Sequence, residues 1–178
     1  MDSINKNQED THHDNLLDEE AIKKIQDLVN KNKSCFFCTE NGVGPSQGVR
    51  PMSVQKVDEE GHLWFLSADD SHKNAELETN PEVRMYFQAS SHSDFLYLTG
   101  HASVSKDKQK IEELWEPIYK TWFTEGKNDP RISVIEVVPE EGYYWDTIHG
   151  KAVGFVKMLI GAAVGKTMDD SIEGRLKV

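Results

Sequence analysis

The stretch VRPMSVQKVDEEGHLWFLSADDSHK, residues 49–73, determines most of what can be predicted about the fold. Its residues 49–57 and 62–67 are rich in β-favouring side chains. The polar, glycine-containing segment 58–61 between them is typical of a turn. We therefore expect two antiparallel strands joined by a short loop.

The end of the same stretch predicts a change from strand to helix. SHKNAELETN, residues 71–80, has the composition of a short helix, and Pro81 ends it. The first turn carries His72 and Lys73. Because the helix dipole makes that end partly positive, carboxylates are preferred there, and two basic residues indicate that a negative group lies nearby.

The surrounding sequence indicates a mainly β protein with flanking helices. Apolar residues recur at helical spacing from Leu17, with acids early and lysines late, and predict a helix that ends near Lys33. In EVRMYFQA, residues 82–89, strict alternation predicts a strand. Closely spaced strands of this kind favour an antiparallel barrel or sandwich. The other predicted strands are residues 34–39, 94–105, 131–139 and 141–147, and the other predicted helices are residues 106–123 and 150–165.

Length and charge exclude several classes of function. The 178 residues suit one domain with tails: a polar, disordered tail at 1–14, a domain at 15–165 and an extension at 166–178. A net charge of −11 disfavours nucleic acid and anionic membranes as partners. No apolar run is long enough for a membrane span, and the first residues lack the apolar core of a secretory signal. We expect a soluble cytoplasmic protein.

Two short motifs have more ordinary explanations than the sites they resemble. Cys35 and Cys38 have the C-x-x-C spacing of zinc and redox sites. On the predicted strand, however, side chains three apart point to opposite faces, so the two cysteines are expected to be structural and no metal site is expected. GAAVGKT, residues 161–167, is one residue short of a phosphate-binding loop and is predicted to be a glycine-rich helix end.

The predicted hairpin brings cationic and hydroxyl side chains towards the start of the helix at residue 71. Ser71 can cap that helix, and Lys73 adds a positive charge beside its free N–H groups. Alternatively, Asp69 and Asp70 could simply balance Lys73. Arg50 and Ser67 should approach the same point from the two strands. A ligand with a phosphate and a flat aromatic body, such as FMN, would suit this arrangement.

Several motifs, in order, resemble one protein family. They are RPM at residue 50, WFLS with the following S-x-K, Asn80-Pro81, LTGHA near residue 100, LWEPIYKTWF with DPR, and EVVPEEGYYWDT. Together they are similar to the bacterial general stress proteins of the pyridoxamine 5'-phosphate oxidase-like family, over residues 15 to 165. The resemblance implies a six-stranded antiparallel split β-barrel that binds FMN, and a homodimer with flavin at the interface.

The resemblance also implies roles for individual residues. Arg50 and Lys73 match cations that hold the flavin phosphate, and His72 stands where the oxidases often have arginine. Trp145 matches an aromatic residue near the flavin of the partner subunit. The remaining flavin contacts that it implies are Met52, Ser53 and Val54 beside the ring, and Leu66 and Ser67 beside the ribityl chain and phosphate.

Departures from the oxidases narrow the expected function. Where the oxidases bind substrate phosphate with tyrosine and arginine, this chain has about Glu113 and Pro117, and a phosphate beside Glu113 would be unfavourable. Vitamin B6 oxidation is therefore not expected. The leading hypothesis is a flavin-dependent oxidoreductase with an unknown small-molecule partner. A non-enzymatic flavin carrier or sensor and a haem-binding relative with a histidine ligand are the alternatives.

Overall fold

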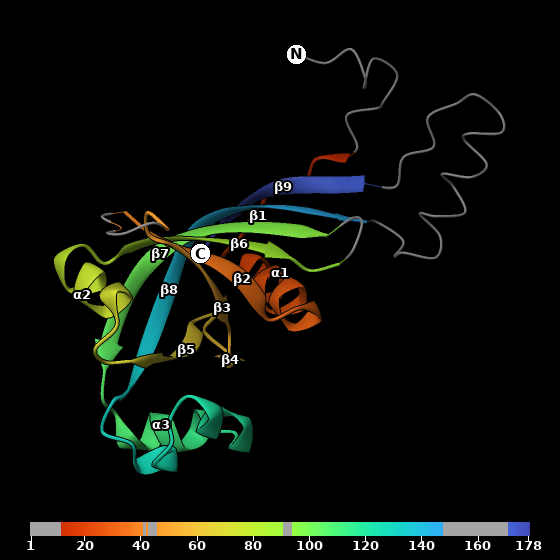
Figure 1. The fold of residues 1–178 in the computed structure, drawn as a ribbon. Helices are drawn as coiled ribbons and strands as arrows, with labels where there is room; N and C mark the ends of the chain where they lie inside the picture. Colours follow the sequence, from red (N-terminus) through yellow and green to blue (C-terminus); the bar gives the residue numbers. More distant parts are fainter. Residues whose placement is uncertain (1–11, 41, 43–45, 91–93, 148–170) are drawn as a thin grey trace, which may run out of the picture.

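The computed structural model describes residues 12–40, 42, 46–90, 94–147 and 171–178. Nine strands of this part of the chain form one curled sheet (Figure 1). Their order is β1-β9-β8-β7-β6-β2-β3, and β5 joins β8 and carries β4. The strands are β1 (Leu16–Leu17), β2 (Ser34–Thr39), β3 (Val49–Ser53), β4 (Lys56–Val57), β5 (Leu63–Ala68), β6 (Glu82–Gln88), β7 (Phe95–Ser105), β8 (Ile132–Thr147) and β9 (Ser171–Lys177).

The pairing of the long strand β8 gives the sheet its split-barrel form. Its first half pairs with β5 and its second half with β9, while β7 runs antiparallel to it along nearly its whole length. Every pairing is antiparallel except that of β1 with β9. The expected mainly β split barrel is confirmed, with more strands than the six predicted.

Alternating side chains of the strands and one face of α1 (Asp18–Lys31) fill the barrel. The predicted alternation of β6 is confirmed, because Val83, Met85 and Phe87 are buried and their neighbours are exposed. Phe37 and Phe65 meet edge to face at 5.4 Å. Burying each large apolar side chain stabilises the fold by about 1.5–3 kcal/mol. The part of α1 that faces this core consists of Ala21, Ile25, Leu28 and Val29.

The predicted hairpin is correct at its loop and wrong at its outer end. β4 pairs with β5 as expected, with Lys56 opposite Trp64. The chain leaves the strand after Ser53, however, and β3 pairs with β2 instead of β5. The N–H of Val54 donates to the carbonyl of Lys33 at this break. Period-two alternation continues through residues 49–57 and does not reveal that the chain changes its partner there.

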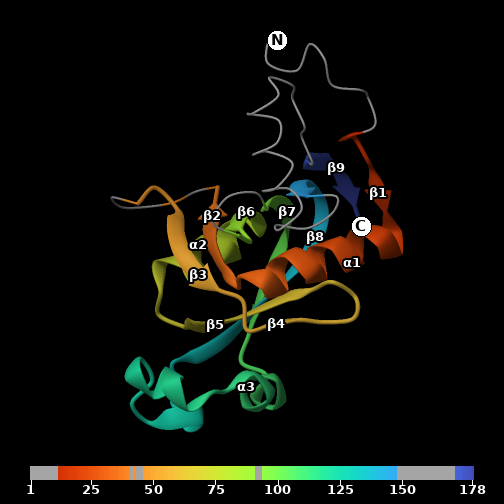
Figure 2. The same ribbon diagram turned by 90° about the vertical axis from the view of Figure 1, so that its right-hand side faces the viewer.

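The helix predicted at 106–123 is shorter than expected. α3 spans Lys108–Leu114, and a 3₁₀ turn, η2 (Pro117–Thr121), follows it. Glu116 is extended because a residue before proline is disfavoured in the helical region. Trp115 packs against the small cluster under α3, whereas Trp122 is exposed. Figure 2 shows this lobe at the opposite end of the molecule from β9.

The C-terminal residues form part of the sheet. β9 was not predicted, and it lies between β1 and β8. Asp14 donates its backbone N–H to the carbonyl of Glu173, so residues 12–14 lie beside this strand. Residues 1–11 of the expected tail, the expected helix at 150–165 and the GAAVGKT motif lie outside the described residues. Within the described residues, no helix has the length and apolar character required to span a membrane.

Leu176→Ala should destabilise the protein by about 2–5 kcal/mol, because Leu176 is 1% exposed and its truncation leaves a cavity. The neighbouring Lys177 is exposed, and Lys177→Ala is the matched control, expected within about 0.5 kcal/mol of wild type. Urea unfolding of the two variants measures the difference. Equal stability of both variants would show that β9 contributes little to the folded core.

Candidate functional site

The first turn of α2 (His72–Thr79) holds a network of buried hydroxyl and amide groups. The Ser71 hydroxyl caps the helix and accepts the backbone N–H of Asn74, as expected. The side-chain oxygen of Asn74 accepts from the hydroxyls of Ser67 at 2.7 Å and Ser71 at 3.1 Å. Its amide donates to Ser133 on β8 at 2.8 Å. Strands β5 and β8 thereby fix the start of α2.

Lys73 points its ammonium into this network although its side chain is buried. Its Nζ donates to the hydroxyls of Ser67 and Ser71. No carboxylate in the described part of the chain lies within ion-pair distance of it. Burial, followed by the nearby charge of Arg50, lowers the pKa of Lys73 to about 8, against the opposing effect of Glu76. The ammonium is thus held by neutral oxygens in a site that disfavours its charge.

Arg50 lies near this lysine but has its own counter-ion. Its guanidinium donates two hydrogen bonds, of 2.7 and 2.8 Å, to one oxygen of Glu76 on α2. Thr39 donates to the same oxygen at 2.6 Å. Arg50, Glu76 and Lys73 therefore carry one net positive charge, and we assign that excess charge to Lys73.

The acidic residues before α2 do not balance Lys73. Asp69 pairs with Lys106 at 2.6 Å, and Asp69 and Asp70 are both exposed. The alternative explanation of the basic helix start, that these acids neutralise it, is therefore wrong for Asp69. The expectation that a negative ligand lies beside Lys73 stays a prediction.

The other predicted contact residues differ in how deeply they are buried and in which face of the sheet they occupy. Arg50 and Met52 lie on the half-buried face of β3, whereas Ser53 is exposed. Val54 is buried in the core directly after the strand. Among the residues near α2, His72 is exposed, and Leu66 packs under α3 on the opposite face of β5 from Ser67.

Trp145 lies far from this network within one chain. It is on the second half of β8, twelve residues after Ser133, which corresponds to about 40 Å along an extended strand. This value is an upper limit, because the sheet is curled, and it places Ser133 and Trp145 towards opposite ends of β8.

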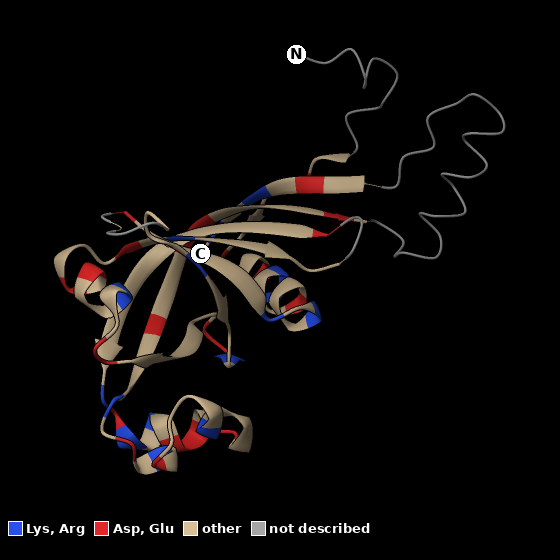
Figure 3. Ribbon diagram, in the orientation of Figure 1, with Lys and Arg blue, Asp and Glu red and all other residues tan. Residues whose placement is uncertain are grey.

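The outer face of the sheet around Trp145 carries a stripe of aromatic side chains. The register aligns Phe36, Tyr86, Tyr97 and Tyr143 across β2, β6, β7 and β8, with Phe95 opposite Trp145 in the next row. The rings of Tyr143 and Trp145 lie 4.7 Å apart, and Tyr144 is buried on the other face. Figure 3 shows that charged residues are sparse on these strands compared with α3.

Sequence analysis missed three residues of the network at α2: Asn74, Glu76 and Ser133. Asn74 could have been noticed, because asparagine three residues after a serine cap is well placed to bond it. Glu76 and Ser133 had no such local signal. Their roles depend on contacts with Arg50 and Asn74, which lie far away in the sequence.

The two cysteines lie on one strand, β2, as predicted. Cys35 is buried, and burial raises the pKa of its thiol to about 12. Cys38 is half-buried and its pKa is also raised by burial. Thiols with raised pKa values are poor nucleophiles and poor metal ligands at neutral pH.

Comparisons with known proteins agree with the fold. The family model described as pyridoxamine 5'-phosphate oxidase like matches residues 20–169. Protein bli-3 of Neurospora crassa is 26% identical over 135 residues, which are 71% of this chain and 65% of that protein. The matched region is therefore less than two thirds of the relative's length.

Two solved structures show the same fold. A Jannaschia sp. CCS1 protein with the provisional name general stress protein 26 superposes with a TM-score of 0.74 at 20% identity, covering 88% of this chain and 97% of that one. The general stress FMN/FAD binding protein of Xanthomonas citri gives a TM-score of 0.61 at 21% identity, covering 70% and 87%. Because the family model spans most of the sequence, the chain belongs to the pyridoxamine 5'-phosphate oxidase-like family.

Proposed function

We propose that the chain binds FMN at the start of α2 and serves as a flavin-dependent oxidoreductase of the general stress type. The observation that carries this proposal is the buried ammonium of Lys73, which has only hydroxyl partners among the described residues. Keeping a cation there costs stability unless an anion compensates it. A phosphate, at nearly two negative charges, would do so.

The residues at this position suit the phosphate of FMN. Lys73 supplies the charge, and the hydroxyls of Ser67 and Ser71 can turn to donate to phosphate oxygens. The first-turn N–H groups of α2 add donors at the positive end of the helix. The half-buried face of β3 at Met52 lies on the neighbouring part of the barrel and offers an apolar surface to the ring.

Bound flavin would supply hydride or single-electron chemistry, and the protein would hold and shield it. In this proposal Lys73, Ser67 and Ser71 bind the phosphate, and Arg50 supports them while its charge stays paired with Glu76. The name of the Xanthomonas citri relative, a general stress FMN/FAD binding protein, supports a flavin.

The proposed assembly is a homodimer that uses the aromatic stripe. Phe36, Tyr86, Phe95 and Trp145 are between 39% and 58% exposed, and large exposed apolar patches usually mark interfaces. A two-fold interface would bring the stripe of one chain to that of its partner. As the family resemblance implies, Trp145 would contact the flavin that is bound by the partner.

Activity on a vitamin B6 phosphate is not part of this proposal. Glu113 bonds Lys56 at 2.5 Å and Lys110 at 3.0 Å, so its carboxylate stays ionised and would repel a substrate phosphate. Pro117 begins the 3₁₀ turn and offers no donor. Bleaching of the bound flavin by NADH or NADPH under argon would support an enzyme, whereas a carrier would stay oxidised.

Lys73→Met should stabilise the ligand-free protein at pH 7, by on the order of 1–3 kcal/mol. Lys73 has a pKa of about 8 in the folded protein, below its ordinary value of 10.5. Between pH 8 and pH 10.5 the folded wild type therefore binds fewer protons than the unfolded chain. Its free energy of unfolding consequently rises with pH over this range. The gain from methionine should therefore shrink as pH approaches 10.5. Thermal unfolding across this range tests it, with the exposed Lys120→Met as control. A pH-independent difference would contradict the buried-charge explanation.

The same Lys73→Met variant should bind FMN more weakly by about 1.5–3 kcal/mol, because a charge-assisted contact is lost. Riboflavin lacks the phosphate, and its affinity should hardly change. Quenching of flavin fluorescence during titration measures both affinities. Equal weakening of the two ligands would place Lys73 at the ring or in the fold instead of at the phosphate.

Trp145→Ala should weaken FMN binding without affecting the hydrogen-bond network at the phosphate, because in the proposed dimer its ring contacts the flavin that the partner binds. Dilution of the wild type towards monomer should release flavin for the same reason. Analytical ultracentrifugation detected at the flavin absorbance follows both effects together. A monomer that retains FMN at micromolar concentration would refute the shared site and the proposed dimer.

A further inference from the structure

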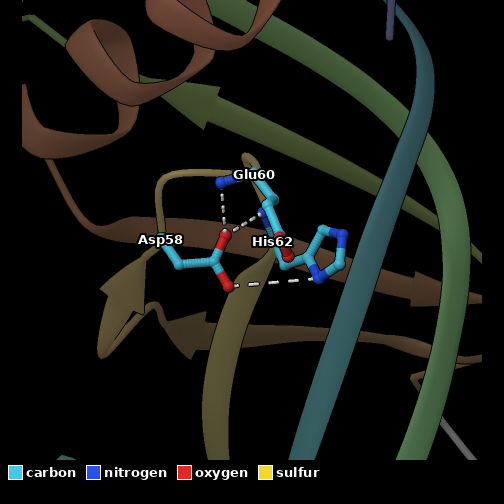
Figure 4. A group of neighbouring side chains, drawn as sticks. All are labelled: Asp58, Glu60 and His62. Atoms are coloured by element: carbon cyan, nitrogen blue, oxygen red, sulfur yellow. Dashed lines mark hydrogen bonds and ion pairs between the residues drawn. The ribbon is translucent and has the colours of Figure 1, made fainter.

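The loop between β4 and β5 places three metal-ligating side chains close together. Asp58, Glu60 and His62 alternate along the loop, and one ligand atom of each lies within 4.8 Å of the others. Gly61 has a φ of +84°, a conformation that favours glycine and lets the chain turn sharply here. Figure 4 shows the Asp58 carboxylate and the His62 ring facing each other across the loop.

The Asp58 carboxylate is oriented before any ion arrives. One oxygen accepts the backbone N–H groups of Glu60 at 3.1 Å and His62 at 2.8 Å. The other oxygen accepts the indole N–H of Trp64 at 2.8 Å. Ligating carboxylates in metal sites are commonly held by outer hydrogen bonds of this kind, which fix the direction of their remaining lone pairs.

A further carboxylate approaches His62 from the central strand β8. Glu136 lies opposite Trp64 in the β5–β8 register, and its Oε1 is 2.8 Å from His62 Nδ1. The same nitrogen is 3.9 Å from the Asp58 oxygen that binds Trp64. His62 Nδ1 therefore lies between carboxylates that come from a loop and from a separate strand.

These carboxylates have no permanent counter-ion in the described part of the chain. No lysine or arginine there lies within ion-pair distance of Asp58, Glu60 or Glu136. Lys56 and Lys110 both form their ion pairs with Glu113, and Lys56 acts on Asp58 only through its longer-range charge. Three negative charges thus converge on one imidazole.

From this arrangement we propose that Asp58, Glu60, His62 and Glu136 form a site for a divalent first-row transition ion such as Zn²⁺ or Co²⁺. His62 would bind the ion through a ring nitrogen, Asp58 and Glu60 would add carboxylate oxygens, and Glu136, beside His62, would supply a further one. The imidazole favours these ions over Mg²⁺ and Ca²⁺, which prefer oxygen alone. This site is separate from the expected flavin residues, and sequence analysis did not expect it.

A metal at this position would fasten the β4–β5 hairpin to β8. Asp58, Glu60 and His62 belong to the hairpin, whereas Glu136 belongs to the strand against which β5 pairs. Because an ion that binds only the folded chain stabilises it, Zn²⁺ should raise the melting temperature. This effect does not require FMN, so failure of the flavin proposal would leave it unchanged.

The test titrates Zn²⁺ into the full chain by calorimetry near neutral pH, without FMN. We expect one ion per chain, with affinity reduced at least about tenfold in His62→Gln and less in Glu136→Gln. His101→Gln is the matched control, because His101, like His62, pairs with a glutamate, Glu140 at 2.9 Å. Unlike His62, His101 does not belong to a group of three metal-ligating side chains in the described part of the chain. Glu60→Gln, at an exposed position, reports on the site without risk to the core.

A second measurement locates the ion. Of the four tryptophans, Trp64 alone donates its indole N–H to Asp58, so Co²⁺ should shift or broaden that one indole resonance most strongly. Unchanged Zn²⁺ affinity in both His62→Gln and Glu60→Gln would overturn the proposal. Equal loss in His101→Gln, tighter binding of Mg²⁺ than Zn²⁺, or an unaffected Trp64 resonance would overturn it as well.

Discussion

The pairing of β8 with three other strands is the constraint on which the rest of the structure depends. β7 follows it along nearly all of its 16 residues, β5 covers its first half and β9 its second half. Its first half carries Ser133 in the network at α2 and Glu136 in the carboxylate cluster, and its second half carries Trp145. One strand thus fixes the positions of three chemically different regions and keeps the last of them far from the first.

The fold could be predicted where the sequence pattern is local. The alternation of β6 and the helical spacing of α1 are complete within their own residues, and the structure confirms both. The partner of β3 could not be predicted in this way. Residues 49–57 alternate as one strand would, and the break after Ser53 becomes visible only when β2 takes the pairing. Pro117, in contrast, was a local signal that the helical apolar spacing obscured.

The candidate site shows the same division. Lys73 and the Ser71 cap follow from residue type and position at a helix start, and they were predicted. The pairing of Arg50 with Glu76 was not predicted. The hydrophobic periodicity and the secondary-structure propensity of a segment carry no information about which side chains meet across the barrel. Because of this pairing, the site has one cation without a charged partner among the described residues, Lys73, and not two.

Arg50 and Lys73 therefore have different parts in the proposed phosphate site, although both are basic and close together. The guanidinium suits a permanent pair, since it stays charged and donates two bonds to Glu76. The ammonium of Lys73 has a lowered pKa and neutral partners, so its charge is the one that a ligand can compensate. If Glu76 were paired with Lys73 instead, the excess positive charge would lie on Arg50, which is on β3 and not in the first turn of α2. The geometry that joins Arg50, Thr39 and Glu76 on three separate elements is what leaves the lysine available.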